Sequence, residues 1–229
     1  MHLPTIQAFI WGLWAACGAP QNHLPPAQAQ YPLPSIHRSM QQTRILLEKA
    51  AASSLPDWEA LAPRYQLGVF AKGADIFAAG EWQPFVYVVR QGMVKLSYTN
   101  DKGEEWIKSF IGEGDFFACP NVLIAGRKTD YAAIALEDSQ IEQVDYATMQ
   151  QLMAQHPAWQ RAIRQLLEWH IVRKEQRERE LLTMRPDERY QSFLDTYPAL
   201  AERIQVRDVA HYLGVTPEGL SRIRKRLRA

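Results

Sequence analysis

Residues 205–229 have the sequence QVRDVAHYLGVTPEGLSRIRKRLRA, which predicts two short amphipathic helices joined at Gly214. In the first half, apolar residues recur at the spacing i, i+3, i+4 and i+7, which lays them along one side of a helix. They are Val206, Val209, Ala210 and Leu213. Gly214 tolerates the positive φ that ends a helix, and Thr216 followed by Pro217 is a typical start of the next one.

The predicted second helix has two different sides. Its apolar side consists of Leu220, Ile223 and Leu227. Its other side has the same helical spacing but no apolar member, and consists of Glu218, Ser221, Arg222 and Lys225. A helix with one buried side and one polar, cationic side fits the major groove of DNA.

We interpret this polar side as a DNA-binding surface. Arg222 can bond both acceptors of guanine, Glu218 can accept from the amino group of cytosine, and Ser221 can bond a base or a phosphate. Contacts to the DNA backbone are assigned to Thr216, Arg224, Lys225, Arg226 and Arg228. The simpler alternative is a solvated basic helix, since most charge runs have no partner. The glycine turn and the two apolar stripes in register favour DNA.

Composition limits the remaining possibilities. The chain has 229 residues, 47% of them hydrophobic, which is enough for one large core or two modest ones. Its formal net charge is only +1, so any DNA contact is local. Cys17 and Cys119 are too few for a disulfide framework, a four-thiolate iron–sulfur cluster or a structural zinc site. We expect free thiols, a reducing cytoplasmic location and no metal or cofactor.

Residues 1–39 differ in composition from the rest. An apolar run from Ile6 to Ala19 precedes a stretch rich in Pro and Gln, which superficially resembles a secretory signal. No Lys or Arg precedes Arg38, whereas signal peptides begin with positive residues, and the run is shorter than the roughly 20 residues that span a bilayer. We expect a disordered extension, or one added by a mis-assigned start with Met40 as the true first residue, and no membrane contact.

Residues 65–145 predict antiparallel strands. Apolar residues alternate with polar ones in short runs, as in Val94, Leu96 and Tyr98. Turn signals divide these runs at Lys72-Gly73, Gly80, Gln91-Gly92, Asp101-Lys102-Gly103 and Gly112 to Asp115. The spacing is typical of a small sandwich or barrel. We predict an α+β fold whose N-terminal part is an antiparallel β-roll, cupin-like or jelly-roll-like.

The histidines bear on what such a roll does. All six lie outside residues 65–145, at His2, His23, His37, His156, His170 and His211. A metal-dependent enzyme of cupin type needs clustered imidazoles inside its barrel, so metal catalysis is disfavoured. The sequence also lacks a Gly-x-Ser-x-Gly elbow and a phosphate-binding Gly-x-x-x-x-Gly-Lys motif. We expect a sensor or a scaffold rather than an enzyme.

One continuous helical stretch is predicted between the roll and the terminal helices, with residues 148–183 as a dimerisation helix. Its stripe of coiled-coil type consists of Trp159, Ile163, Leu166, Leu167 and His170, and continues to Ile171. We interpret the stripe as a dimer interface, because helix-turn-helix units usually come two per dimer, about 34 Å apart. The alternative is that the stripe packs only on its own roll. A further helix from Pro186 would place Tyr190, Phe193 and Leu194 inward.

A roll, a long helix and a terminal helix-turn-helix, in this order, resemble the Crp/Fnr superfamily of bacterial transcription regulators over residues 46–227. The most specific part is DVAHYLGVTPEGLSRIRKR (208–226), similar to that family's recognition helix, where a Glu-x-x-Ser-Arg arrangement contacts bases. Glu218, Ser221 and Arg222 occupy those places. The resemblance implies a homodimer that binds a palindromic operator in double-stranded DNA and acts with RNA polymerase.

The chain departs from the members of that family that bind cyclic nucleotides. After a Gly-Asp-Phe run, those members have a Gly-Glu pair that holds the ribose and, later, an Arg-Ser or Arg-Ala pair that binds the phosphate. Here Ala118-Cys119 and Thr129-Asp130 stand at the matching positions, and a carboxylate repels a phosphate. We expect no cyclic AMP binding, with Arg127 and Lys128 nearby as an alternative anion site. The candidate pocket for an unknown small-molecule effector consists of Phe117, Ala118, Cys119, Thr129 and Asp130.

Four parts follow from these observations: the extension (1–39), a cyclic-nucleotide-binding-like β-roll sensor (40–147), the dimerisation helix (148–183) and a helix-turn-helix DNA-binding domain (184–229). We interpret the chain as a sequence-specific DNA-binding transcription regulator whose dimer helix relays a change in the roll to the recognition helices. The rival is a ligand-binding regulatory module whose C-terminal helices contact a protein partner. An enzyme is the third hypothesis.

Overall fold

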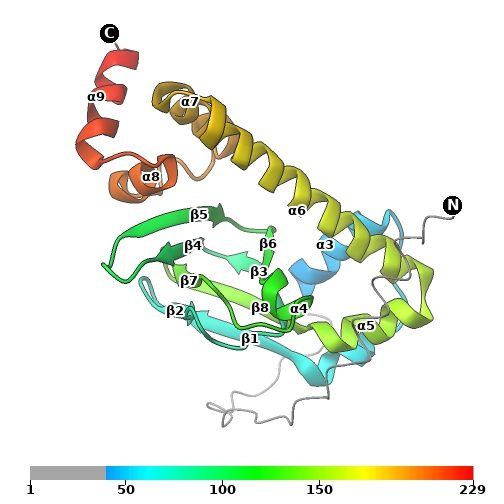
Figure 1. Cartoon of the computed structure of the whole chain (residues 1–229). Coiled ribbons are helices and arrows are strands. Elements are labelled where there is room, and N and C mark those ends of the chain that lie inside the picture. The colour runs from blue at the N-terminus through cyan, green and yellow to red at the C-terminus, as the bar shows by residue number, and fades with distance from the viewer. Residues whose placement is uncertain (1–39, 229) are drawn as a thin grey trace, which may run out of the picture. The chain divides into compact units, whose positions relative to one another are not determined.

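The computed structural model describes residues 40–228, so the extension predicted over residues 1–39 lies outside the described residues. Within residues 40–228 the fold is α+β, as predicted: two four-stranded antiparallel sheets with helices before and after them (Figure 1). In this part of the chain, no helix combines the length and the apolar character needed to cross a membrane.

The two sheets form the predicted roll. The strands are β1 (Tyr65–Phe70), β2 (Asp75–Phe77), β3 (Phe85–Gln91), β4 (Val94–Thr99), β5 (Glu105–Ile111), β6 (Phe116–Ala118), β7 (Ala132–Ala135) and β8 (Ser139–Asp145). One sheet has the order β1-β8-β3-β6 and the other β2-β7-β4-β5, so the chain passes repeatedly between them. The predicted turns are confirmed by positive φ at Gly73, Gly80, Gly92, Gly103 and Gly114. At Gly92 a Cβ would lie 2.3 Å from Ser139 Oγ, so both space and φ require glycine.

Helix α3 (Gln41–Ala51), which the sequence analysis did not predict, begins at a buried carboxylate of the roll. Glu142 of β8 is fully buried and accepts hydrogen bonds from the Thr43 N–H (2.8 Å), the Thr43 hydroxyl (2.6 Å) and the Gln42 N–H (3.3 Å). Free N–H groups in the first turn of a helix favour a negative charge there. Glu142 therefore joins α3 to the roll, and α3 packs on the long helix.

The helical stretch after the roll is two helices, so the prediction of one continuous helix was wrong. Helix α5 (Tyr146–Gln155) begins where the Asp145 carboxylate accepts the Thr148 N–H at 2.8 Å. His156 is extended, with φ −132° and ψ 118°, and Pro157 starts α6 (Pro157–Thr183). A residue before proline is disfavoured in the helical region, which explains the break. The predicted dimerisation helix is therefore limited to α6. Two further short helices belong to the roll part of the chain: η1 (Trp58–Arg64), which precedes β1, and α4 (Pro120–Leu123), which follows β6.

The terminal helices lie where they were predicted. Helix α7 (Pro186–Thr196) precedes α8 (Val206–Leu213), which ends at Gly214 with φ 67°. Helix α9 (Pro217–Arg228) begins with the Thr216 hydroxyl accepting the Gly219 N–H at 3.1 Å. Leu220 and Ile223 are buried as expected. Leu227, predicted to be buried with them, is 50% exposed because it lies near the end of α9.

Replacing Glu142 with glutamine should lower the free energy of unfolding by about 1–3 kcal/mol, because an amide then faces N–H donors at a fully buried site. Urea unfolding at 25 °C followed by circular dichroism measures this. The control is Glu59→Gln at an exposed position, expected within about 0.5 kcal/mol of the parent. Equal stability of the two variants would contradict the role of Glu142.

Candidate nucleic-acid interface and roll pocket

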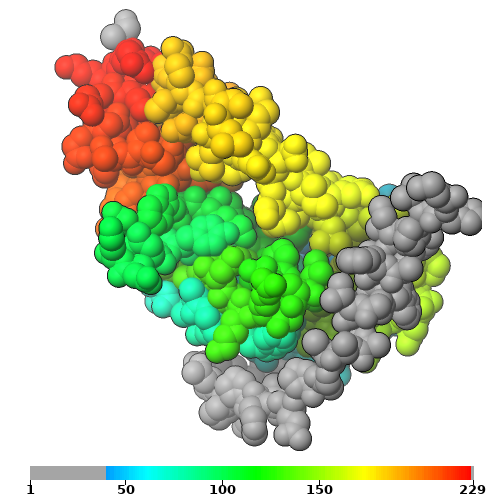
Figure 2. Space-filling view, in the orientation of Figure 1, coloured from blue at the N-terminus to red at the C-terminus, as the bar shows by residue number. Residues whose placement is uncertain are grey.

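The polar side of α9 is open to solvent, as its sequence pattern predicts. Glu218, Ser221 and Arg222 are all exposed, as is Lys225, whereas Leu220 on the opposite side is only 1% exposed. Figure 2 shows α9, in red, at the surface of the molecule. Among residues 40–228, none of these four polar side chains has an ion pair or a side-chain hydrogen bond. The structure thus brings the predicted base-contacting residues together on one accessible surface.

The predicted contacts to the DNA backbone are less uniform. Lys225 is exposed, but Arg224 is half-buried, and Arg226 Nη2 lies 2.9 Å from Asp187 Oδ2 of α7. An exposed pair of this kind is weak and exchanges its partner easily. The Thr216 hydroxyl is already used as the N-cap of α9. The side chain of Arg228 lies outside the described part of the chain.

Helices α7 and α8 rest on the outer face of β5 through an aromatic cluster. The Phe110 ring of β5 lies 6.1 Å from Phe193, 6.0 Å from Tyr197 and 5.4 Å from Tyr212, measured between centroids. Phe193 is 2% exposed, and Tyr190 and Leu194 pack beside it, as predicted for α7. Phe110 itself was not predicted to contact the terminal helices.

The predicted effector pocket lies in a roll interior that aromatic rings occupy. Phe117 stacks on Tyr87 with centroids 4.8 Å apart and an angle of 8° between the rings. Phe77 lies 5.4 Å from Tyr87 and 5.7 Å from Tyr131. Phe117 and Cys119 are only 2% and 1% exposed. These rings pack closely on one another inside the roll.

The other predicted pocket residues have structural partners. The Tyr131 hydroxyl donates to the Ala118 carbonyl at 2.8 Å. Thr129 is buried, and its hydroxyl donates to the Ala78 carbonyl at 3.0 Å. Asp130 is exposed. Phe117 and Cys119 therefore lie in one buried cluster of the roll, whereas Ala118 packs on the other face of β6, against the cluster that contains α3 and α6. Thr129 holds a loop at the end of the strands, and Asp130 faces solvent.

Lys108 is a charged residue of the roll that sequence reasoning missed. Its ammonium lies 4.0 Å from the centroid of the Tyr131 ring. Burial, and then the charge of Lys174 on α6, lower the pKa of Lys108 to about 8. Burial and nearby cations, Lys108 first among them, lower the pKa of His170 on α6 to about 4, so His170 is neutral near pH 7. A lone cation within the apolar run WIKSFI (106–111) was the available signal.

The predicted dimer stripe divides into a buried half and an exposed half. Trp159, Ile163 and Leu166 are 0%, 5% and 4% exposed within their own chain, so placing them at a dimer interface was wrong. The reason is α3, which covers this face; the Trp159 indole also donates to the Pro56 carbonyl at 2.9 Å. His170 is half-buried, and Leu167 is 42% exposed. The alternative, packing on the same chain, holds for the buried three.

Comparison with known proteins agrees with this architecture. Residues 67–156 match the cyclic nucleotide-binding domain family. The chain is 26% identical over 166 residues to the fumarate and nitrate reduction regulatory protein of Vibrio cholerae, covering 66% of this chain and 64% of that one. It is also 26% identical over 163 residues to the transcriptional regulatory protein btr of Bordetella pertussis, covering 66% of each. The similarity thus spans slightly less than two thirds of either relative.

A solved structure shows the same fold. FixK2 from Bradyrhizobium japonicum superposes with a TM-score of 0.64 at 23% sequence identity, covering 72% of this chain and 84% of that one.

Titration calorimetry with cyclic AMP should detect no binding at micromolar concentrations. The reasons are the packed rings around Phe117 and the absence of an arginine at Thr129 to hold the phosphate. A protein known to bind cyclic AMP, titrated in the same buffer, controls for ligand quality. A saturable heat signal with micromolar affinity would contradict this expectation.

Proposed function

We propose that this chain is a homodimeric transcription regulator of Crp/Fnr type that recognises a palindromic DNA operator through α9; the sequence similarity to named regulators supports this. The observation that carries the proposal is the division of α9 into a buried apolar side and an exposed, unpaired polar side. The two relatives described above are named as regulators, which agrees with this proposal.

The polar side of α9 supplies the groups that base recognition needs. Arg222 presents a planar fork of donors that matches the two acceptors of guanine in the major groove. Glu218 lies one turn earlier and offers an acceptor for a cytosine amino group, and Ser221 bonds a base or a phosphate. Lys225, one turn further on, supplies attraction to phosphate that is independent of sequence.

The exposed apolar residues of α6 support pairing with a second copy. Leu167, Ile171, Val172, Leu181 and Leu182 are between 42% and 76% exposed on this one helix. Leu167, Ile171 and Leu181 fall on the repeat of about 3.5 residues that brings two helices together as a coiled coil. A two-fold dimer of this kind presents two recognition helices to successive major grooves, about 34 Å apart.

The roll serves as the sensor in this proposal. The charge of Lys174 acts on Lys108 of β5, and Asp115 pairs with Arg173 at 2.5 Å. The packing of the Phe117 and Tyr87 rings disfavours a purine as the effector. We assign no cofactor.

Arg222→Ala should weaken binding to a duplex selected from a random DNA pool by about 1–3 kcal/mol and relax the preference at one base pair. Lys225→Ala is the matched comparison: it should weaken all duplexes alike and reduce the slope of log affinity against log salt by about 1. Fluorescence anisotropy over a salt series measures both. If the parent protein bound no duplex at any salt concentration, the rival module that contacts a protein partner would replace this proposal.

Ile171→Glu should convert the dimer into a monomer at micromolar concentration and abolish cooperative binding to a palindrome, because it buries a charge in the proposed seam. Analytical ultracentrifugation measures the oligomeric state. Val69→Glu is the control, since Val69 is an equally branched and exposed residue on the roll, and it should remain dimeric. An Ile171→Glu protein that sediments as a dimer would contradict pairing through α6.

A further inference from the structure

We infer that Lys95, on the roll, is a positioning residue for the recognition helix: it holds α8 on the roll through a buried ion pair with Asp208. Its consequence for DNA affinity rests on the proposed function of α9. The docking of α8 on the roll is argued from geometry alone.

The ion pair is buried on both sides. Lys95 of β4 is 7% exposed and Asp208 of α8 is 2% exposed, and Lys95 Nζ lies 3.2 Å from Asp208 Oδ1. Among residues 40–228, Lys95 is the only hydrogen-bond or ion-pair partner of the Asp208 side chain. A buried carboxylate needs a cation or donors, because removal from water is costly. Asp208 is therefore satisfied within the protein only while α8 lies against the roll.

Lys95 supplies the positive charge in a cluster that also contains Glu105, Asp208 and His211. Its Nζ lies 2.7 Å from Glu105 Oε1, and His211 Nδ1 lies 3.4 Å from Glu105 Oε2. Burial opposes the ionisation of Glu105, but hydrogen bonds and the charge of Lys95 keep the pKa of Glu105 below its usual value. Glu105, Asp208 and His211 are types of residue that bind metals, with ligand atoms within 4.8 Å of one another. The Lys95 ammonium already bonds to both carboxylates, so we assign no metal.

Apolar packing also joins α8 to the roll. Met93, Ile107 and Phe110 of the roll lie in one buried cluster with Val209 and Leu213 of α8. Arg203 adds a second ionic contact to the roll, with Nη2 2.8 Å from Glu113 Oε1 and bonded also to Glu137. This contact is about one third exposed, so it is screened more than the Lys95 pair.

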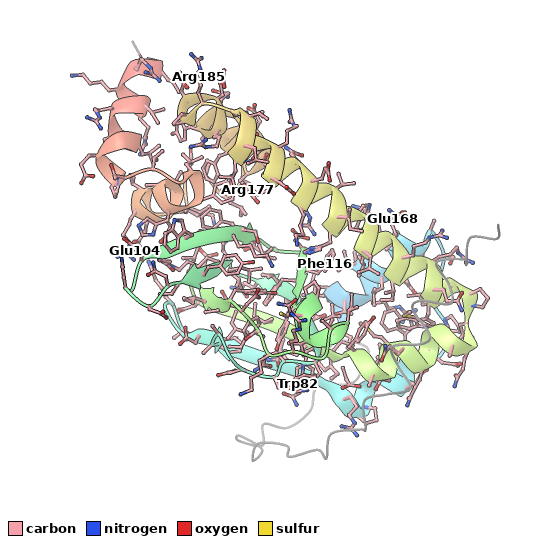
Figure 3. All side chains as sticks on the ribbon, in the orientation of Figure 1. Trp82, Glu104, Phe116, Glu168, Arg177 and Arg185 are labelled. Atoms are coloured by element: carbon pink, nitrogen blue, oxygen red, sulfur yellow. The ribbon has the colours of Figure 1, made fainter. Side chains whose placement is uncertain are left out.

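Helix α8 is also held from the side of α6. Arg177 of α6, labelled in Figure 3, lies beside α8, with its guanidinium carbon 3.8 Å from the centroid of the Tyr212 ring. It also donates to the Tyr212 carbonyl. Helix α8 therefore receives contacts from both the roll and the proposed dimer helix.

Strand β4 links the interior of the roll to this ion pair. Leu96 packs in the aromatic core of the roll, and its neighbour Lys95 points to the opposite face, toward α8. A shift of β4 caused by a change in that core would therefore move Lys95 and, through Asp208, the helix pair. This gives the roll a route to α9 that does not pass through the dimer helix.

The test is Lys95→Met, which keeps the apolar stem but leaves Asp208 and Glu105 without a cation. Affinity for a duplex selected by the parent protein should fall at least tenfold, while the salt slope stays unchanged because Lys95 does not contact phosphate. Amide hydrogen exchange of residues 206–213 should accelerate, and that of β3 and β8 should not. The triple variant Lys95→Met/Glu105→Gln/Asp208→Met, which also removes the two carboxylates that Lys95 bonds, should bind within threefold of the parent, since uncharged residues can replace a buried ion network.

Lys102→Met in an exposed turn is the matched control and should change neither readout. Asp208→Asn keeps the shape of the side chain but removes its charge. It should weaken DNA binding and accelerate the amide exchange of residues 206–213, both by less than Lys95→Met does. Unchanged amide exchange in Lys95→Met, no recovery of DNA affinity in the triple variant, or tighter DNA binding by Lys95→Met would each overturn the inference. A rise in the melting temperature of the parent on addition of zinc would contradict the claim that Lys95, rather than a metal ion, neutralises Glu105 and Asp208. If the parent binds no duplex, the amide hydrogen exchange of residues 206–213 in Lys95→Met still tests whether Lys95 holds α8 on the roll.

Discussion

The burial of one side of α9 against α8 is the constraint on which the rest of this structure depends. A twelve-residue helix with several cations is not stable alone in water, so α9 exists because Leu220 and Ile223 are buried. The same burial forces Glu218 and Arg222 to the opposite side, where only solvent or another molecule can meet them. Helix α8 can provide this support because it rests in turn on Phe110 of the roll. Helix α9 therefore packs on α8, and α8 packs on the roll.

Local patterns predicted the parts of the fold whose signals are local. The glycine turns, the alternating strands, and the cap and stop signals of α8 and α9 are all carried by neighbouring residues. Helix α3 was missed because the acceptor at its first turn, Glu142, lies 99 residues away from Thr43. The break before Pro157 had a local signal, the proline itself, but the interpretation followed the apolar periodicity of the stretch and predicted one helix.

The candidate site was predicted to a similar extent, and for similar reasons. The resemblance to the Crp/Fnr regulators is confirmed, and the exposed side of α9 follows from helical spacing alone. The dimer stripe was wrong for Trp159, Ile163 and Leu166 because helical spacing does not tell which partner covers an apolar face, and α3 covers Trp159. The dimer role of Leu167 and His170 stays a prediction. Lys95 and Lys108 were missed because their significance lies in distant partners, Asp208 and Tyr131.

Hydroxyl-radical footprinting on a duplex selected from a random pool tests the central claim most directly, because it reports both recognition helices at once. The account predicts two protected stretches on one face of the duplex, about one helical turn or about 10 base pairs apart, related by the symmetry of the selected sequence. A single protected stretch, or uniform protection without a selected sequence, would contradict the claim that paired α9 helices recognise bases.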